Sequence, residues 1–227
     1  ILNYAKERDA YAMERYLRHK NYKVHLLNIA DPKKSTISFD PLGFIESYAD
    51  IDSLSAAIVD MTIQRTVDDY WQAKAKPLLS GLIAGCLMTS TGNTAPGMTE
   101  VLKLFDQLLP HEDGYSVETP LDAMFQKISD AAPDCYAVRE FNSWHSLPYR
   151  TASCVRDTLA SALSTVFPEG IRSMMQKKPQ FDPVKFASRK EALIVITSAV
   201  DRSQQYYANL FYRFTEQQLL RYAASCP

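Results

Sequence analysis

The sequence predicts a mainly α-helical fold, a helical bundle with a few flanking strands and helices that belong to an α/β unit. Apolar residues recur at helical spacing through most of the 227 residues, which is typical of amphipathic helices. Only residues 23–29 and 192–199 are short, apolar runs rich in leucine or β-branched residues, as strands are. Such strands are usually buried in a parallel sheet covered by helices. Because two strands alone do not make this sheet, we expect the missing strands outside this sequence. We also expect the two runs to lie close together at one end of the helical body.

The first predicted helix spans residues 7–20 and leads directly into the strand at residues 23–29. Pro32 and Pro41 then predict a loop, because the residue before a proline is disfavoured in helical backbone. The apolar stripe of the next helix consists of Ile51, Leu54, Ile58 and Met61. The helical block therefore begins close to residue 50.

The following helix starts near Asp68 and contains Pro77. We expect a kink or a break there, since an interior proline costs about 3 kcal/mol. Thr119 is a predicted helix cap, because Pro120 follows it and Asp122 stands three residues later. Other helices are predicted at residues 98–109, 134–144, 148–167 and 203–224. The side chains expected in the core are Trp71, Leu79, Leu82, Phe105, Phe125 and Leu159.

The formal net charge of -1 excludes a strongly basic nucleic-acid-binding protein. The charge is nevertheless uneven, because residues 100–134 hold eight acids and two lysines, whereas residues 135–190 hold nine Lys or Arg and four acids. Clustered cations attract phosphates and acidic partners alike, although an ordinary solvated surface explains the same pattern. The candidate partner-binding or DNA-binding residues are Arg150, Arg156, Arg172, Lys177, Lys178, Arg189 and Lys190.

The cysteines are widely spaced and form no Cys-x-x-Cys pair. This spacing predicts reduced thiols and no metal site. The four residues are Cys86, Cys135, Cys154 and Cys226. No cationic and apolar signal-peptide pattern opens the given sequence, and the longest apolar run, residues 78–88, is too short to cross a bilayer. We therefore expect a soluble, cytosolic protein.

Several short segments occur in an informative order. They are Tyr22-Lys23-Val24-His25-Leu26-Leu27-Asn28-Ile29-Ala30-Asp31-Pro32 with Ser35, then Phe39-Asp40-Pro41-Leu42, Asp50-Ile51, Asp69-Tyr70-Trp71, Thr119-Pro120-Leu121-Asp122-Ala123-Met124-Phe125 and Lys190-Glu191-Ala192-Leu193-Ile194-Val195-Ile196. No single segment is diagnostic, but together they run nearly from end to end of the chain. Their order resembles the coupling proteins of type IV secretion systems, the membrane-anchored hexameric ATPases of bacterial conjugation. The closest resemblance is to the versions on conjugative elements of Gram-positive bacteria.

This resemblance implies a RecA-like α/β nucleotide-binding motor domain that is interrupted by an all-alpha insertion domain. Residues 1–45 would be a flanking piece of the motor domain, residues 46–188 the insertion domain, and residues 189–227 a strand and helix that return to the motor domain. The implied partners are a relaxase or a relaxosome accessory protein, with single-stranded DNA as a further ligand. The implied parent protein is a homohexamer at the inner side of the plasma membrane, which uses ATP and Mg. The fragment itself would be a monomeric, cytoplasmic domain.

The departures from the family pattern concern catalysis. A phosphate-binding loop requires Gly-x-x-x-x-Gly-Lys-Ser/Thr, so that backbone amides and a lysine surround the phosphates. The sequence contains no Gly-Lys dipeptide, and the family's acidic strand motif is absent. We therefore expect no cofactor in this chain and no ATP hydrolysis. Residues 1–6 resemble the segment that follows the phosphate-loop helix, but the strand expected before Glu7 is absent, so we expect a missing stretch at Lys6-Glu7.

Three hypotheses remain open. The first is a non-catalytic substrate-recognition domain of a coupling protein, with weak and salt-dependent DNA affinity because the net charge is near zero. The second is a part of an intact DNA-translocating ATPase motor. The third is an unrelated helical enzyme that uses His145 and Cys154 as a nucleophilic pair, although the sequence offers no third residue to orient them.

Overall fold

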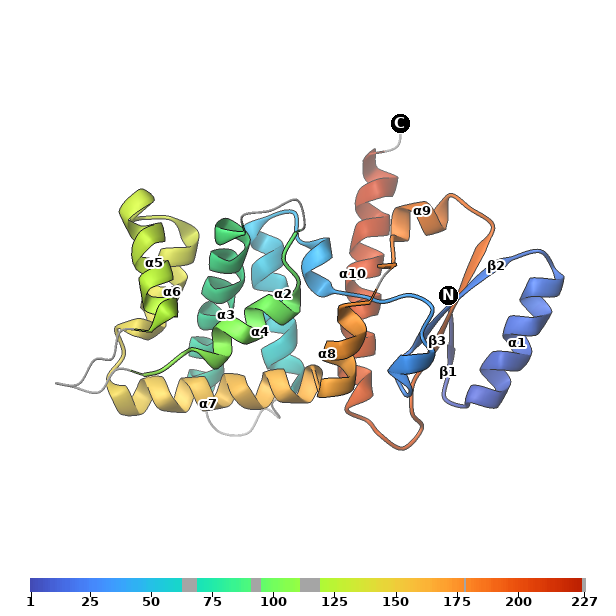
Figure 1. Cartoon of the computed structure of the whole chain (residues 1–227), viewed down its shortest axis with the longest axis horizontal. Helices are drawn as coiled ribbons and strands as arrows, with labels where there is room; N and C mark the ends of the chain where they lie inside the picture. Colours follow the sequence, from blue (N-terminus) through green and yellow to red (C-terminus); the bar gives the residue numbers. More distant parts are fainter. Residues whose placement is uncertain (63–68, 91–94, 111–118, 178, 226–227) are drawn as a thin grey trace. The chain divides into compact units, whose positions relative to one another are not determined.

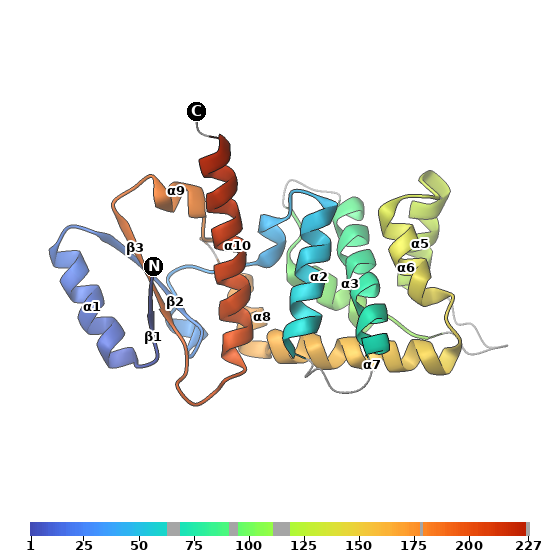
Figure 2. The same ribbon diagram turned by 180° about the vertical axis from the view of Figure 1, so that it is seen from behind.

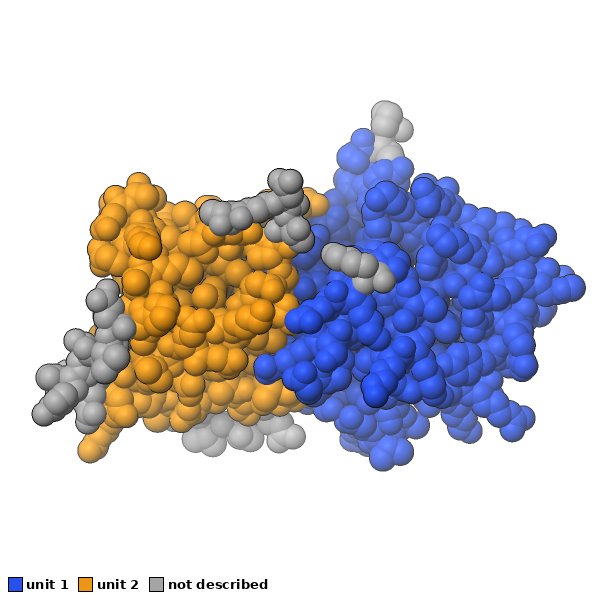
Figure 3. Space-filling view, in the orientation of Figure 1, with its two compact units in different colours: residues 1–44, 166–227 blue, residues 45–165 orange. Residues whose placement is uncertain are grey.

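The computed structural model describes residues 1–62, 69–90, 95–110, 119–177 and 179–225 (Figure 1). It is mainly helical with a small parallel sheet, which confirms the predicted fold class. The chain forms two compact units (Figure 3). We call Ile1–Phe44 together with Val166–Pro227 the α/β unit, and Ile45–Thr165 the helical unit. Each has its own core.

The sheet of the α/β unit has three strands, β1 (Leu2–Tyr4), β2 (Lys23–Asn28) and β3 (Glu191–Ile196). Their order is β1-β3-β2, and both pairs are parallel. The two predicted strands therefore pair directly, as expected, with Lys23 opposite Glu191 and Asn28 opposite Ile196. The expectations that every further strand lies outside the sequence and that no strand precedes Glu7 are wrong, because β1 lies inside the sequence and before Glu7. The partner of this short strand, β3, lies far away in the sequence, so no local sequence pattern marks β1 as a strand.

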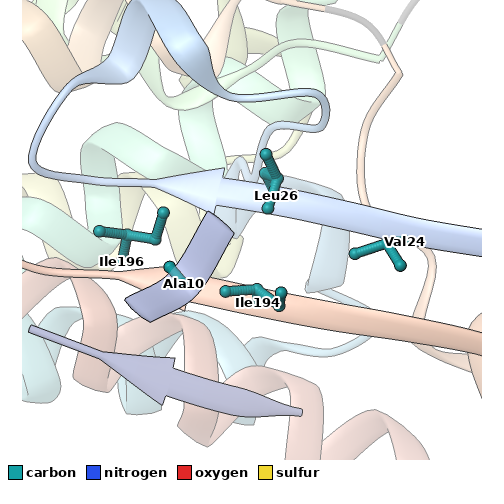
Figure 4. Packing of buried hydrophobic residues seen from close by; sticks show 5 residues of the cluster. All are labelled: Ala10, Val24, Leu26, Ile194 and Ile196. Carbon is teal, nitrogen blue, oxygen red and sulfur yellow. The ribbon is translucent and has the colours of Figure 1, made fainter. Parts of the chain in front are cut away.

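The helix α1 (Glu7–His19) covers one face of the sheet. Ala10 packs there against apolar side chains of the two longer strands (Figure 4). The contacts come from Val24, Leu26, Ile194 and Ile196. The helix ends at a Schellman motif, in which the Tyr22 amide donates to the Leu17 carbonyl and the Asn21 amide to the Arg18 carbonyl, both at 3.0 Å. Asn21 has a φ of 60°, a left-handed conformation that asparagine tolerates.

The remainder of the α/β unit consists of two 3-10 turns, Pro32–Lys34 and Pro41–Phe44, and the helices α8 (Glu169–Met175), α9 (Pro183–Ala187) and α10 (Gln204–Ser225). Its second core is aromatic. The Phe39 ring makes edge contacts with Phe44, Tyr207 and Phe211 at centroid distances of 5.1, 5.5 and 5.3 Å. The buried Tyr207 hydroxyl donates to the Phe39 carbonyl, which fixes α10 to the loop after β2.

The helical unit contains α2 (Tyr48–Thr62), α3 (Asp69–Thr89), α4 (Met98–Asp106), α5 (Pro120–Ala131), α6 (Tyr136–His145) and α7 (Tyr149–Val166), whose last residue is counted with the α/β unit. Contacts radiate from α3 to α2, α4, α5 and α6. Figure 2 shows the same elements from behind. Thr119 caps α5 as predicted, since its hydroxyl accepts from the Asp122 amide at 3.2 Å and the Asp122 carboxylate accepts from the Thr119 amide at 2.8 Å.

Glycine is required where α3 meets α6. A Cβ at Gly81 would lie 2.7 Å from the backbone nitrogen of Phe141, closer than real Cβ atoms come. The absence of a side chain at Gly81 therefore lets the backbone of α3 lie directly against the backbone of α6. Beside this crossing, the rings of Phe125 and Phe141 stack at 3.8 Å.

Two expectations about the helices need correction. The predicted return from the insertion at residue 189 is too late, because the α/β unit resumes at Val166. The physical reason is a set of contacts to the loop after β2, in which the Ser38 hydroxyl donates to the Lys177 carbonyl at 2.6 Å and Ser38 forms a bridge with Gln180. The helices α8 and α9 were not predicted at all.

Pro77 does not break α3, which continues through it. The predicted start of this helix at Asp68 lies outside the described residues.

Candidate functional site

The carboxyl ends of the three parallel strands meet at one edge of the sheet, where Tyr4, Ile196 and Asn28 stand in register. Open α/β sheets bind ligands at this edge, because the loops that follow the strands converge there. We therefore describe it as the candidate site of the α/β unit. Its polar groups come from the first turn of α1, the loop after β2 and the loop after β3.

Asn28 organises the first half of this edge. It is fully buried, its side-chain amide donates to Glu7 at 2.9 Å, and its side-chain oxygen accepts from the Asp31 amide at 2.8 Å. The Lys34 ammonium lies 3.0 Å from Glu7 and 3.2 Å from Asp31. The hydrogen bonds from Asn28 and Lys34 lower the pKa of Glu7, and the bond to Glu7 raises the pKa of Lys34. Both side chains are therefore charged at neutral pH.

The loop after β3 is held by its own side chains. The Ser198 hydroxyl accepts from the amides of Val200 and Asp201 at 3.1 and 3.0 Å, and the Gln204 side chain accepts from the Ser198 amide at 2.8 Å. The Asp201 carboxylate accepts from the Ser203 hydroxyl at 2.6 Å, and this bond and the Ser203 amide lower the pKa of Asp201. The loop thus presents an ionised carboxylate just before α10.

These side chains already form hydrogen bonds and ion pairs with one another and with nearby backbone amides, so none of them is available as a free general acid or base. Over the described ranges, no three His, Cys, Asp or Glu side chains are close enough together to hold a metal ion. The edge therefore offers ordered loops and charge, and its organising residue Asn28 was not singled out from the sequence. The available signal was a polar residue at the last position of an apolar strand.

The predicted basic residues do not form one group. Arg156 donates to the Leu108 carbonyl, Arg172 to the Phe167 carbonyl and Lys177 to the Pro32 carbonyl, at 2.8, 2.8 and 2.9 Å. These three cations therefore hold backbone segments together. The exposed members are Arg150, on α7 in the helical unit, and Arg189 and Lys190, beside β3 in the α/β unit. Lys178 lies outside the described residues.

The residues of the enzymatic hypothesis lie on different helices. His145 is the last residue of α6, where its ring stacks on Phe141 at 5.5 Å. Cys154 is exposed on α7. Cys86, Cys135 and Cys154 form no disulfide, and Cys226 lies outside the described residues.

Most of the side chains predicted for the core are buried. Leu79, Leu82 and Leu159 are fully buried, and Phe105 and Phe125 nearly so. Trp71 is the exception, because it is only partly buried. The deeply buried tryptophan is Trp144, whose indole nitrogen donates to the Ala152 carbonyl at 2.9 Å. Helical phase alone could not distinguish the two residues, since both lie in helices with many apolar side chains.

A further surface feature lies along α10. A mostly apolar hollow is lined by Ile1, Tyr212, Thr215, Glu216, Leu219 and Leu220. The hydroxyls of Tyr212 and Thr215 are buried and have no hydrogen-bond partner among the described residues. Burial raises the pKa of Tyr212 to about 12. Unsatisfied buried hydroxyls destabilise a protein, so this hollow suits a covering segment that supplies polar groups. Sequence reasoning did not find it.

The whole chain was compared with known proteins. The family model for type IV secretory system conjugative DNA transfer matches residues 9–225. The chain belongs to this family. No curated protein gave a match. The matched residues run through both compact units and include β2 and β3. Within the described part of this conjugative-transfer chain, no helix has the length and apolar character needed to cross a membrane.

Proposed function

We propose that this conjugative-transfer chain is the cargo-recognising part of a type IV secretion coupling protein, and that the helical unit recognises the cargo. The observation that carries the proposal is the position of the helical unit in the chain. It is inserted between β2 and β3, which are neighbours in the sheet. A unit with its own core, inserted in a connection between adjacent strands, can acquire a binding surface without disturbing the sheet.

The cargo would be a relaxase or a relaxosome accessory protein. This assignment rests on the family match and on the surface chemistry of the helical unit. Two exposed aromatic side chains, Tyr48 and Tyr70, project from α2 and α3. The Tyr48 ring stacks on Tyr136 at 4.5 Å, and Arg139 lies over the Tyr136 ring at 5.5 Å. Exposed aromatic and Arg side chains are enriched where proteins bind proteins.

The α/β unit would be part of the motor domain of the parent ATPase. Support comes from the parallel sheet, from the outer edge of β1, which is unpaired within the described residues, and from the hollow beside α10. Further strands of a larger sheet would cover both. The residues of this chain do not fit ATP and Mg on their own, because Lys34 is held by Glu7 and Asp31 and the sequence has no Gly-Lys dipeptide. We therefore expect no phosphate release from ATP by residues 1–227.

The parent protein would act as a homohexamer at the cytoplasmic side of the plasma membrane, and the isolated chain would be monomeric. Light scattering on the purified chain should give the mass of one copy. A stable oligomer of residues 1–227 would contradict this part of the proposal.

Lysine cross-linking tests the recognition role directly, because both units carry accessible lysines. The purified chain would be mixed with the relaxase of its own conjugative element and treated with a lysine-reactive cross-linker. Cross-links should concentrate on the helical unit, at Lys74, Lys76, Lys103 and Lys127, and should be absent with a relaxase from an unrelated element. Cross-links confined to lysines of the α/β unit, such as Lys6, Lys33 and Lys185, would refute the assignment to the helical unit.

A further inference from the structure

The amino ends of β2 and β3 lie at the edge of the sheet opposite the candidate site. The turn between α1 and β2 runs beside the segment that leads into β3, because the Lys23 amide donates to the Lys190 carbonyl at 3.2 Å. Figures 1 and 2 show both turns at the same end of the sheet. We call Tyr16, Lys20, Tyr22, Lys23, Arg189 and Lys190 the amino-edge surface.

The outward charge of this surface is positive, although the chain as a whole carries a net charge of -1. Its four cations, Lys20, Lys23, Arg189 and Lys190, are all exposed. Glu191 is the carboxylate that pairs with Lys23 and Arg189, and its side chain is only 10% exposed. The four cations therefore face solvent while the Glu191 carboxylate is mostly buried, which leaves a local field that attracts anions.

Two exposed tyrosines are interleaved with these cations. Tyr16 is 56% exposed, and the Lys20 ammonium lies 5.8 Å from the centroid of its ring. Tyr22 is 36% exposed, and the Lys190 ammonium lies 4.9 Å from the centroid of its ring. Each pair places a cation beside a flat aromatic face. An unpaired nucleotide offers the complementary pair of groups, a phosphate and a planar base.

The fold holds these side chains in place before any ligand arrives. The Schellman motif at Asn21 fixes the direction of the chain between Tyr16 and Tyr22. Glu191 is anchored by His25 at 2.8 Å and lies 3.4 Å from Lys23, which ties the start of β3 to β2. A ligand that spans both turns would therefore meet a surface that needs little reordering.

We propose that the amino-edge surface binds single-stranded DNA, with the four cations on phosphates and Tyr16 and Tyr22 stacked on bases. A single strand fits better than a duplex, because only unpaired bases expose the faces on which tyrosines stack. The proposal is independent of cargo recognition by the helical unit, since every residue of the surface belongs to the α/β unit. Either one can fail while the other holds.

The charge contribution can be measured by fluorescence anisotropy with residues 1–227 and a fluorescein-labelled oligothymidylate. The double variant Arg189→Gln, Lys190→Gln should bind at least tenfold more weakly. Its logarithmic salt dependence should be shallower by roughly 1.4, because each phosphate contact to a single strand contributes about 0.7. The matched control Lys103→Gln, Lys127→Gln removes two exposed cations of the helical unit and should bind like the wild type. Equal affinity of both double variants would overturn the proposal.

Stacking is tested by a pair of substitutions at one position. Tyr22→Ala should weaken binding about tenfold, whereas Tyr22→Phe, which keeps the ring, should retain the wild-type affinity. Circular dichroism should show that these surface variants keep the helical content of the wild type. If Tyr22→Ala binds as tightly as Tyr22→Phe, the surface acts by charge alone and the proposal is wrong. Tighter binding to a duplex of the same length, or to phosphatidylserine vesicles, would likewise overturn it in favour of another anionic partner.

Discussion

Gly81→Ala should destabilise the helical unit, whereas Gly85→Ala in the same helix should be close to neutral. A Cβ at Gly81 would lie 2.7 Å from the backbone nitrogen of Phe141 and 3.1 Å from its Cα, so α3 and α6 would have to move apart. A Cβ at Gly85 would lie 2.8 Å from Phe125 Cζ and 3.3 Å from Met124 Cε. Those atoms are the ends of side chains, and a small shift of a side-chain end costs less than the separation of two backbones.

The magnitude follows from two opposing effects. Replacing glycine by alanine within a helix is favourable by about 1 kcal/mol. Overpacking a core costs about 1–3 kcal/mol. At Gly81 the upper part of that range applies, because the obstacle is backbone and Phe141 is itself buried and stacked on Phe125. The net loss in the free energy of unfolding should be about 1–2 kcal/mol for Gly81→Ala. For Gly85→Ala the two effects should nearly cancel.

Urea unfolding followed by tryptophan fluorescence is the appropriate assay. Both tryptophans of the chain, Trp71 and Trp144, lie in the helical unit, so the signal reports this unit alone. With a slope of about 2 kcal/mol per molar urea, Gly81→Ala should lower the midpoint by about 0.5–1 M. A midpoint equal to or above that of the wild type would refute the close backbone approach of α3 and α6.

Three further predictions concern single contacts. Thr119→Ala removes the cap of α5 and should cost about 1 kcal/mol, which a lower urea midpoint would reveal; an unchanged midpoint would contradict the role of the cap. Asn21→Ala should cost about 1 kcal/mol because of the positive φ, while Asn21→Gly should be tolerated, and equal melting temperatures of the two variants would argue against the strain. Burial would raise the pKa of Glu191, but hydrogen bonds from His25 and Lys23 outweigh it and hold the pKa below its ordinary value of 4.5. The stabilisation by Glu191 is therefore present above pH 4.5 and lost as the pH falls through the lowered pKa. Glu191→Gln should cost about 1–2 kcal/mol at pH 7, and thermal melting should show this difference closing in acid; a difference that persists at pH 2 would contradict the ionic origin.

The strands and caps that were predicted correctly have strong local signals. The run that became β3 is apolar and rich in isoleucine and valine, and Thr119 combines three helix-start features within four residues. The strand β1 has only three residues, and its partner β3 lies at the other end of the chain, so no local pattern marks it. At Pro77 a strong local signal misled, because a kink or break was expected and α3 continues through the proline. The packing of buried side chains immediately after it outweighs the helix-breaking preference of proline. These side chains are Leu78, Leu79, Leu82 and Ile83.

The candidate surfaces were less predictable than the elements. Arg156, Arg172 and Lys177 have the composition of a binding patch, yet each donates to a backbone carbonyl of a distant or neighbouring loop. Only the tertiary contacts reveal that. Lys190 was a candidate binding residue from the sequence, but its neighbour Tyr22 was not, because the parallel pairing of β2 with β3 is what brings them together.

The insertion of the helical unit between two paired strands also constrains the order of folding. His25 and Glu191 form a hydrogen bond across 166 residues, and closing a flexible loop costs about 0.6 kcal/mol for each doubling of its length. Contacts of α3 with α2 and α4 join helices that follow one another, and such local contacts form quickly. We therefore expect the helical unit to fold first and to shorten the flexible chain between the strands. During synthesis on a ribosome, β1 and β2 would remain unpaired until β3 emerges, and their apolar faces would be exposed to chaperones during that time.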